Sequence, residues 1–124
     1  MCGYSALESC IGLWFALEPA TTVNSCMWAA RGGHTAPLKS RFYKQGDEMV
    51  IVALNDLALA DCTTPLEADT GRLVVLRGRL PHLSHENKSA ISRYAYALQL
   101  TDGDCSYPDN NWLQRSTELP LRGF

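Results

Sequence analysis

Three histidines and five cysteines are the side chains in this sequence best suited to binding a metal. The histidines are His34, His82 and His85, and imidazole is the commonest metal ligand among side chains. The chain contains no H-E-x-x-H, C-x-x-C, H-x-D or H-x-E motif, so spacing alone predicts no metal site. One metal hypothesis remains open from residue types: a zinc-binding β-domain that uses Cys26, Cys105, His82 or His85.

Short strands are predicted to carry or flank these side chains. Residues 10–18 (CIGLWFALE) alternate with a period of two and are apolar on both faces, which predicts a strand covered on two sides. Residues 72–80 (RLVVLRGRL) predict a buried strand that ends just before Pro81 and His82. Residues 93–100 (RYAYALQL) alternate again, so Arg93 begins a strand.

The remaining segments predict further strands and loops. Residues 25–30 form a second short strand that can pair with the first as a hairpin, because Pro and Asn lie between them. The basic run at residues 39–44 (KSRFYK) is interpreted as a solvated insertion. Residues 49–54 (MVIVAL) suit either a strand or a short helix. The polar tail from Asp102 onward is predicted to be extended and pinned by Trp112.

Length and hydrophobic content predict one domain over residues 1–124. The short strands, joined by turns and without a long helix, predict a mostly β fold: a sandwich, a barrel-like sheet or a half barrel. The formal charge of −2 gives no field that would attract nucleic acid or an anionic membrane. The apolar run at residues 10–17 is far shorter than the roughly 20 residues that span a bilayer, and no signal peptide is visible. Five scattered cysteines, an odd number, favour reduced thiols and therefore the cytoplasm.

Two blocks of this sequence resemble the phytanoyl-CoA dioxygenase family. Residues 12–18 (GLWFALE), 24–28 (NSCMW) and 32–34 (GGH) look like the family's succession of a strand with a small residue and Trp, an N-G turn, and a P-G-S-H loop. Residues 71–95 (GRLVVLRGRLPHLSHENKSAISRYA) are similar to the family's more specific pattern G-x-L-V-L-x-x-G-x-x-x-H-x-S-x-x-N-x-S-x-x-S-R-x-A-Y.

The C-terminal residues also carry a resemblance. Residues 111–114 (NWLQ) and 118–120 (ELP) look like the ending of the phytanoyl-CoA dioxygenase domain-containing subgroup. Together the matching blocks cover most of the chain except a divergent insertion at about residues 37–66. The resemblance implies the C-terminal part of a double-stranded β-helix (a jelly-roll or cupin-like fold) that is incomplete at its N-terminal side.

The resemblance implies that the complete protein is a hydroxylating dioxygenase with iron(II) and 2-oxoglutarate as its cofactors. It places the distal iron ligand at His82 and the arginine that binds the far carboxylate of 2-oxoglutarate at Arg93. Ser92, or less directly Ser89, is expected to add a hydroxyl donor. The complete form is expected to act on a small molecule, an acyl-CoA or another apolar compound.

The chain departs from the family pattern at the metal site. The family's H-x-D pair belongs upstream of Gly12, and residues 1–11 (MCGYSALESCI) contain neither His nor Asp. One imidazole does not hold iron(II) against water, because affinity comes from several ligands together. The chain by itself is therefore expected to be inactive and to retain no iron. Ser25 and Arg31 are further departures, since the family favours Gly and Pro at these positions.

Two functional hypotheses follow. In the first, the chain is the C-terminal part of an active iron(II)/2-oxoglutarate dioxygenase. In the second, it is a non-catalytic remnant that acts as a binding or regulatory partner, with self-association through an exposed sheet edge.

Overall fold

The computed structural model of the chain describes residues 9–120, which form eight strands and one short 3₁₀ helix. Every paired strand runs antiparallel to its neighbour. The mostly β fold class predicted from the sequence is confirmed. No helix in the described part of the chain is long and apolar enough to cross a membrane.

One sheet has the strand order β6-β1-β8. It consists of β1 (Ile11–Ala16), β6 (Leu73–Arg77) and β8 (Ala95–Leu100). These are the three segments whose alternation or apolar runs predicted strands. The central strand β1 pairs with β6 on one side and β8 on the other.

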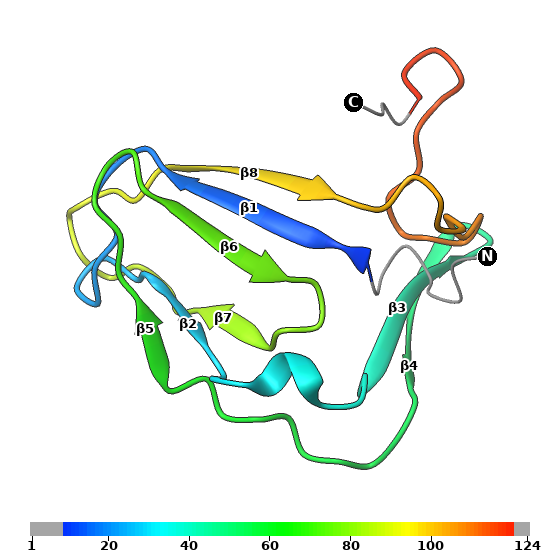
Figure 1. Cartoon of the computed structure of the whole chain (residues 1–124), viewed down its shortest axis with the longest axis horizontal. Coiled ribbons are helices and arrows are strands. Elements are labelled where there is room, and N and C mark those ends of the chain that lie inside the picture. The colour runs from blue at the N-terminus through cyan, green and yellow to red at the C-terminus, as the bar shows by residue number, and fades with distance from the viewer. Residues whose placement is uncertain (1–8, 121–124) are drawn as a thin grey trace.

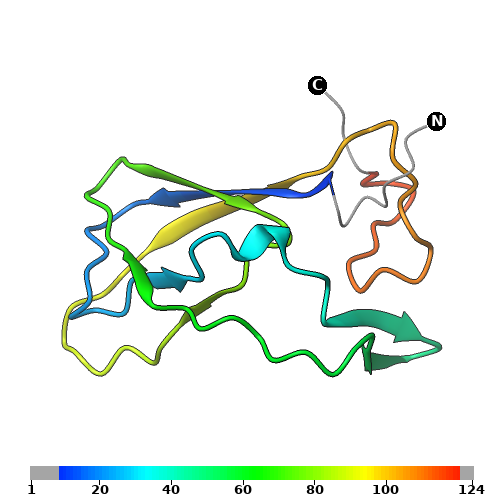
Figure 2. The same ribbon diagram turned by 60° about the horizontal axis from the view of Figure 1, so that its bottom comes forward.

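A second sheet has the strand order β5-β2-β7 and lies beneath the first in Figures 1 and 2. It consists of β2 (Met27–Ala29), β5 (Thr64–Leu66) and β7 (His82–Ser84). The chain passes from one sheet to the other between β1 and β2, and again at each step from β5 to β8. The result is a partial β-sandwich of the jelly-roll type.

The predicted hairpin between the first two strands is wrong. β1 pairs with β6 and β8, whereas β2 pairs with β5 and β7. Residues 17–26 carry the chain across to the other sheet instead of reversing it within one sheet. A turn sequence indicates that the chain changes direction. The strand with which β1 or β2 pairs is determined by residues distant in the sequence.

The core lies between the two sheets. Its fully or nearly buried members are Trp14, Ala16, Ala20, Cys26, Met27 and Leu76. Trp14 and Ala16 alternate along β1 with Ile11, Leu13 and Phe15, which lie on the opposite face. That outer face was expected to be covered. Ile11 is instead 41% exposed, and Phe15 packs against Tyr96 at a ring separation of 6.5 Å.

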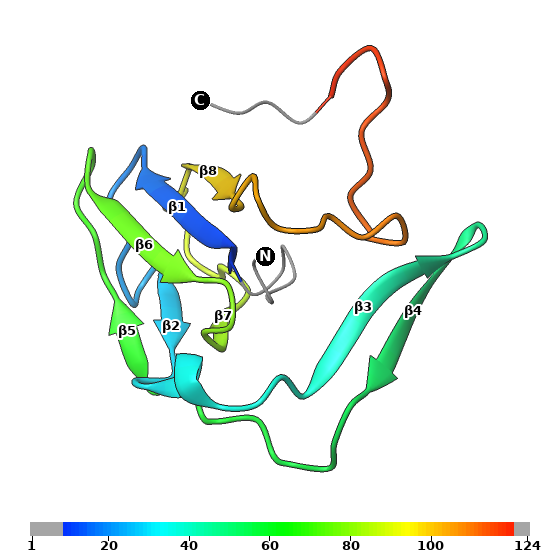
Figure 3. The same ribbon diagram turned by 45° about the vertical axis from the view of Figure 1, so that its right-hand side comes forward.

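The insertion forms a hairpin of β3 (Ser40–Gln45) and β4 (Glu48–Ala53). Gly46 supplies the left-handed turn between them, with φ of 61°. The structure therefore resolves the choice at residues 49–54 in favour of a strand. Figure 3 shows the hairpin extending away from both sheets, linked to them through the 3₁₀ helix η1 (Gly33–Thr35).

The tail after β8 is anchored differently from the prediction. Trp112 is 54% exposed, while Asn111 and Cys105 are buried. Asn111 forms an isolated bridge with Tyr43 of β3, beside a hydrogen bond from the Lys44 amide to the Asn110 carbonyl of 2.8 Å. Backbone pairing with the insertion hairpin therefore holds the tail, rather than burial of the indole.

Cys10, Cys26 and Cys62 are free thiols in this structure, and Cys2 lies outside the described residues.

Candidate functional site

His82 is the first residue of β7, directly opposite Ala29 of β2, and Ser84 is opposite Met27. Side chains that are directly opposite in an antiparallel pair lie on the same face of the sheet. Ala29 and Met27 are both buried between the sheets. His82 and Ser84 therefore face the space between the sheets, with His82 at its open end, where the imidazole is exposed.

The hydrogen bonding of His82 fixes which ring nitrogen is available. Its Nδ1 lies 2.8 Å from the Leu80 carbonyl oxygen. A carbonyl oxygen only accepts hydrogen bonds, so Nδ1 carries a hydrogen, and in the neutral imidazole the lone pair is then on Nε2. Metal-binding histidines are commonly oriented in this way by a carbonyl on the other nitrogen. The neutral form of the His82 imidazole therefore has the tautomer that metal-binding histidines commonly adopt.

Close packing of a glycine sets where β7 begins. A Cβ atom added to Gly33 would lie 2.8 Å from Cδ of Pro81, so only glycine permits this approach. The Ala30 amide also donates to the Pro81 carbonyl at 3.0 Å. The loop that follows β2 thus fixes the residue immediately before His82.

Arg93 lies two residues before β8 and is held by both sheets. Its Nη2 donates to Ser84 Oγ at 3.2 Å, and its guanidinium carbon lies 5.6 Å from the centre of the Trp14 ring. The Ser84 hydroxyl also donates to the Ser25 carbonyl at 3.2 Å. A cation over an indole face gains about 0.5–2 kcal/mol.

Ser84 and Trp14 are members of this site that the sequence did not predict. Ser84 is two residues after His82, and a period of two on one strand puts both on the same face. Trp14 was assigned to a strand only. Ser92, the predicted hydroxyl donor, contributes its carbonyl oxygen to Asn24, while Ser89 bonds with Asn87. The hydroxyl that contacts Arg93 is that of Ser84.

The backbone on each side of Arg93 is fixed by side chains of the segment between β1 and β2. Asn24 is only 2% exposed and donates from Nδ2 to the carbonyls of Pro19 and Ser92, at 2.8 and 3.0 Å. Its Oδ1 accepts from the Thr21 amide at 2.7 Å. On the other side, the Tyr94 amide donates to Glu18 Oε2 at 3.0 Å.

Ser25 adopts a left-handed backbone with φ of 66°. This geometry explains why glycine would be preferred there, since a non-glycine residue in that region costs about 1–2 kcal/mol. The Ser25 hydroxyl donates to the Glu86 carbonyl at 2.9 Å. That bond compensates part of the strain and joins the loop to the segment after β7.

The Cys26 thiol lies in the core near Arg93, and its burial is the main influence on its pKa. Desolvation raises its pKa above the ordinary value of 9.0, and the charge of Glu67 raises it further. A hydrogen bond from the Leu66 backbone and the charge of Arg93 act in the opposite direction. The net effect is a neutral thiol at physiological pH.

Within residues 9–120, no three His, Cys, Asp or Glu side chains converge to hold a metal ion. His85 packs edge-on against Trp28 at 6.3 Å, and Trp28 pairs with Leu83, on the face opposite His82. The structure therefore does not bring together the zinc ligands considered from the sequence. For iron(II) likewise, the described residues do not form a complete centre.

One family of known proteins matches most of the chain. The profile of the family described as Phytanoyl-CoA dioxygenase (PhyH) matches residues 3–95, a span that contains Trp14, His82, Ser84 and Arg93.

Three curated relatives illustrate the similarity. The protein named Phytanoyl-CoA dioxygenase 1 of Oryza sativa subsp. japonica is 42% identical over 115 residues, covering 90% of this chain and 40% of the relative. Phytanoyl-CoA dioxygenase of Arabidopsis thaliana is 36% identical over 114 residues, covering 91% and 40%. Phytanoyl-CoA dioxygenase domain-containing protein 1 of Mus musculus is 31% identical over 116 residues, covering 90% and 40%. The chain thus spans about 40% of the length of the relatives it matches.

Proposed function

The chain belongs to the phytanoyl-CoA dioxygenase family, and on that basis we propose that it supplies one half of an iron(II)/2-oxoglutarate hydroxylase site. The half consists of the distal iron ligand, His82, and the residues that bind 2-oxoglutarate, Arg93 and Ser84. The single observation that carries the proposal is that His82, with a free Nε2, lies on the same strand face as the serine that orients Arg93.

Arg93 is suited to bind the far carboxylate of 2-oxoglutarate. A guanidinium meets a carboxylate with two parallel charge-assisted hydrogen bonds, which a lysine cannot reproduce. Ser84 and Trp14 hold the guanidinium from two sides, so little side-chain freedom is lost when the ligand binds. No carboxylate within residues 9–120 forms an ion pair with Arg93. Its charge is therefore available for a ligand.

His82 would hold iron(II) together with two ligands supplied outside the described residues. Iron(II) with three protein ligands keeps coordination positions open for 2-oxoglutarate and O₂. When bound, the metal, the keto acid and O₂ supply the oxidising power for hydroxylation. The 124-residue chain alone is proposed to be inactive, because one imidazole gives too little affinity to retain iron(II).

The substrate proposal rests on the names of the relatives. Phytanoyl-CoA is an acyl thioester, and we extend that class to the complete form of this protein: an acyl-CoA or another small apolar molecule. A cytoplasmic location is proposed from the odd number of scattered cysteines. Fluorescence microscopy of the tagged protein tests that location.

A chimera tests the half-site. The portion of the rice relative that this chain does not cover is fused to residues 1–124, and succinate formation from 2-oxoglutarate is measured with iron(II) and O₂. His82→Ala is expected to abolish succinate formation. Arg93→Lys is expected to raise the KM for 2-oxoglutarate at least about tenfold, because a bidentate charge-assisted contact is lost. The exposed Arg72→Gln serves as the control. Full activity of the His82→Ala chimera would refute the assignment.

The alternative function is a non-catalytic binding partner, and one observation favours it. In the described residues each of these sheets has two unpaired edges, at β6 and β8 in one sheet and at β5 and β7 in the other. Unpaired edges accept strands of another chain. Light scattering of the purified chain tests self-association, with Leu98→Pro in β8 as the edge variant. A monomer at all concentrations would argue against pairing between copies.

A further inference from the structure

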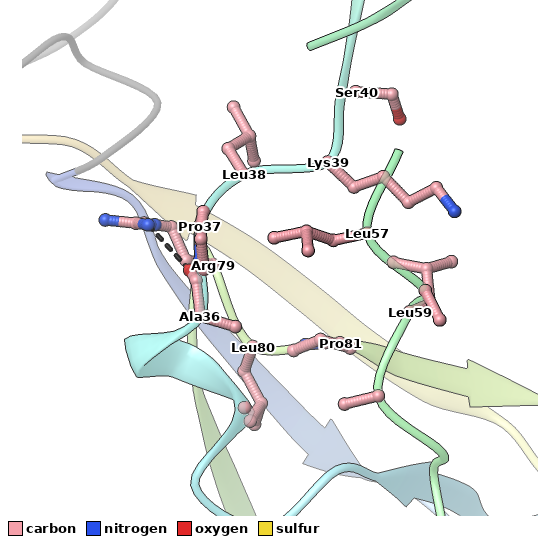
Figure 4. A pocket seen from close by; sticks show the side chains of 14 residues that line it. Ala36, Pro37, Leu38, Lys39, Ser40, Leu57, Leu59, Arg79, Leu80 and Pro81 are labelled. Atoms are coloured by element: carbon pink, nitrogen blue, oxygen red, sulfur yellow. Dashed lines mark hydrogen bonds between the residues drawn. The ribbon is translucent and has the colours of Figure 1, made fainter. Parts of the chain in front are cut away.

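A groove of 220 Å³ lies where the insertion meets the turn between β6 and β7. Most of the side chains that line it are aliphatic, among them Leu38, Leu57, Leu59, Leu80 and Pro81. Figure 4 shows the Leu57 side chain directed across the groove toward the segment of Pro37 and Leu38. An apolar cavity of roughly 150 Å³ is large enough to bind benzene, so this groove has room for a short hydrocarbon group. It is called the aliphatic groove below.

Hydrogen bonds hold the walls of the aliphatic groove together. Asn55 Nδ2 donates to the Leu38 carbonyl at 2.9 Å, and Asn55 Oδ1 accepts from the Leu57 amide at 3.1 Å. One side chain therefore connects the wall that contains Leu38 to the wall that contains Leu57. The Ala36 carbonyl accepts from Arg79 Nη2 at 2.6 Å, which joins the first wall to the turn after β6. Because the groove is formed before a ligand arrives, less ordering entropy is lost on binding.

The base of the aliphatic groove is joined directly to the proposed iron ligand. Leu80 and Pro81 line the groove and are the two residues before His82. The Leu80 carbonyl accepts the hydrogen bond from His82 Nδ1 at 2.8 Å. Gly33, which also lines the groove, lacks the Cβ that would meet Pro81. A ligand in the groove therefore contacts the segment that positions the His82 imidazole.

The exposure and charge of the lining indicate the class of ligand. Leu38, Leu57 and Leu59 are 39%, 54% and 64% exposed, so an aliphatic group in the groove removes apolar surface from water. No Asp or Glu is among the described residues that line the groove, whereas Lys39 is. A molecule that is aliphatic at one end and anionic at the other, as an acyl-CoA is, therefore meets no opposing carboxylate in this lining.

We propose that the aliphatic groove receives the hydrocarbon end of the substrate, and that Leu57 and Leu59 of the insertion select for that end. The inference rests on the proposed hydroxylase function, which makes the ligand a substrate. It goes further because it assigns the alkyl group to residues outside the half-site, since neither His82 nor Arg93 lines the groove. Each CH₂ group that enters the groove should tighten binding about threefold to fourfold until the groove is full.

The test uses the 124-residue chain without iron or 2-oxoglutarate, with ¹³C-labelled leucine methyl groups. Butanol, hexanol and octanol are titrated separately. The Leu57 and Leu59 signals, identified by their loss in Leu57→Gln and Leu59→Gln, are expected to move saturably, with an affinity that rises about threefold to fourfold for each added CH₂. Leu73 is the matched control, because it is 45% exposed but lies opposite Phe15 on the outer face of β6. The absence of saturable movement, or movement of Leu73 with the same concentration dependence, would overturn the proposal.

Variants test the two leucines. Leu57→Gln keeps the backbone amide that bonds to Asn55 and is expected to weaken octanol binding about fivefold to tenfold, measured at the Leu59 signal. Leu73→Gln changes an equally accessible leucine outside the groove and should bind octanol as the unaltered chain does. An unchanged Leu98 signal shows that each variant is folded. A folded Leu57→Gln chain with unaltered octanol affinity would contradict the proposal.

Octanoyl-CoA and CoA without an acyl group test the substrate class. Octanoyl-CoA is expected to move the Leu59 signal in the direction that octanol does, whereas CoA alone leaves it in place. Equal movement with CoA would overturn the assignment of the groove to the alkyl group.

Failure of this inference is distinguishable from failure of the proposed function. A chimera that forms succinate, together with a chain that binds no octanol, overturns the groove and leaves the half-site standing. Octanol binding by the chain, together with full activity of the His82→Ala chimera, overturns the half-site and leaves the groove as a site for aliphatic groups.

Discussion

Replacement of Asn24 by Ala should remove the side chain that connects the segment after β1 to the residue before Arg93. Asn24 accepts from the Thr21 amide and hydroxyl at 2.7 and 3.1 Å. It donates to the carbonyls of Pro19 and Ser92 at 2.8 and 3.0 Å. At about 1 kcal/mol net for each hydrogen bond, with solvent reaching some of the freed groups, the free energy of unfolding should fall by about 3–4 kcal/mol. A typical domain has only about 5–15 kcal/mol in total.

Asn24→Asp separates the acceptor from the donor half of this arrangement. The variant keeps Oδ1 for Thr21 but turns a second oxygen toward the Pro19 and Ser92 carbonyls, which disfavours the carboxylate and raises its pKa in the folded state. A raised folded pKa gives stability that is present below the unfolded pKa, about 3.9, and is lost as pH rises through the folded value. The Asp variant should therefore become less stable relative to the unaltered chain as pH rises from 4 toward about 7.

Urea denaturation, followed by circular dichroism at several pH values, measures both variants. An Asn24→Ala chain within about 1 kcal/mol of the unaltered protein would refute the argument, because it would mean that water replaces all four hydrogen bonds at no cost. A flat difference between Asn24→Asp and the unaltered chain across pH would refute the assignment of Nδ2 as the donor to the two carbonyls.

Three further predictions use the same denaturation assay. Ser25→Ala should be less stable than Ser25→Gly by roughly 1 kcal/mol, since both lose the hydroxyl but only alanine keeps the left-handed strain; equal stabilities would contradict the strain. Gly33→Ala should lose about 1–3 kcal/mol because its Cβ meets Pro81, whereas Gly103→Ala, with open space around it, should change little. Burial raises the pKa of the Cys26 thiol, so as pH rises the unfolded chain loses this proton before the folded chain does. The free energy of unfolding should therefore fall as pH rises above about 9, and less steeply in Cys26→Ala. Identical slopes of unfolding free energy against pH in the two proteins would argue against burial of that thiol.

The local sequence pattern was enough to predict the strands β6, β1 and β8, but it did not predict how the strands divide between the two sheets. Alternation in residues 10–18 and 93–100 and the apolar run in 72–80 predicted β1, β8 and β6, because period two is visible within each segment. The pairing of β1 with β6 and β8 is a contact between residues about 60–90 positions apart, which no local pattern encodes. The predicted hairpin failed for this reason.

The residues of the candidate site also differ in whether the sequence predicts them. His82 and Arg93 were selected by resemblance to a family motif, and in the structure Arg93 donates to Ser84, which lies two residues after His82 on β7. Ser84 itself is recognisable only after its strand and register are known, because many serines in the segment carry the same hydroxyl. Trp14 was missed for a related reason: its role arises from a cation contact with Arg93, a residue distant from it in the sequence. The tail was misjudged because an exposed indole and a buried amide have reversed the usual preference of Trp and Asn for the core and the surface.

We propose that these 124 residues carry one iron ligand and the 2-oxoglutarate arginine, and therefore half of a centre. Equilibrium dialysis of the purified chain against iron(II) and 2-oxoglutarate, without oxygen, tests it most directly, with the absorption of metal-bound keto acid recorded in parallel. Weak, non-stoichiometric iron binding and no such absorption are predicted for the chain. One equivalent of tightly held iron together with that absorption would contradict the account.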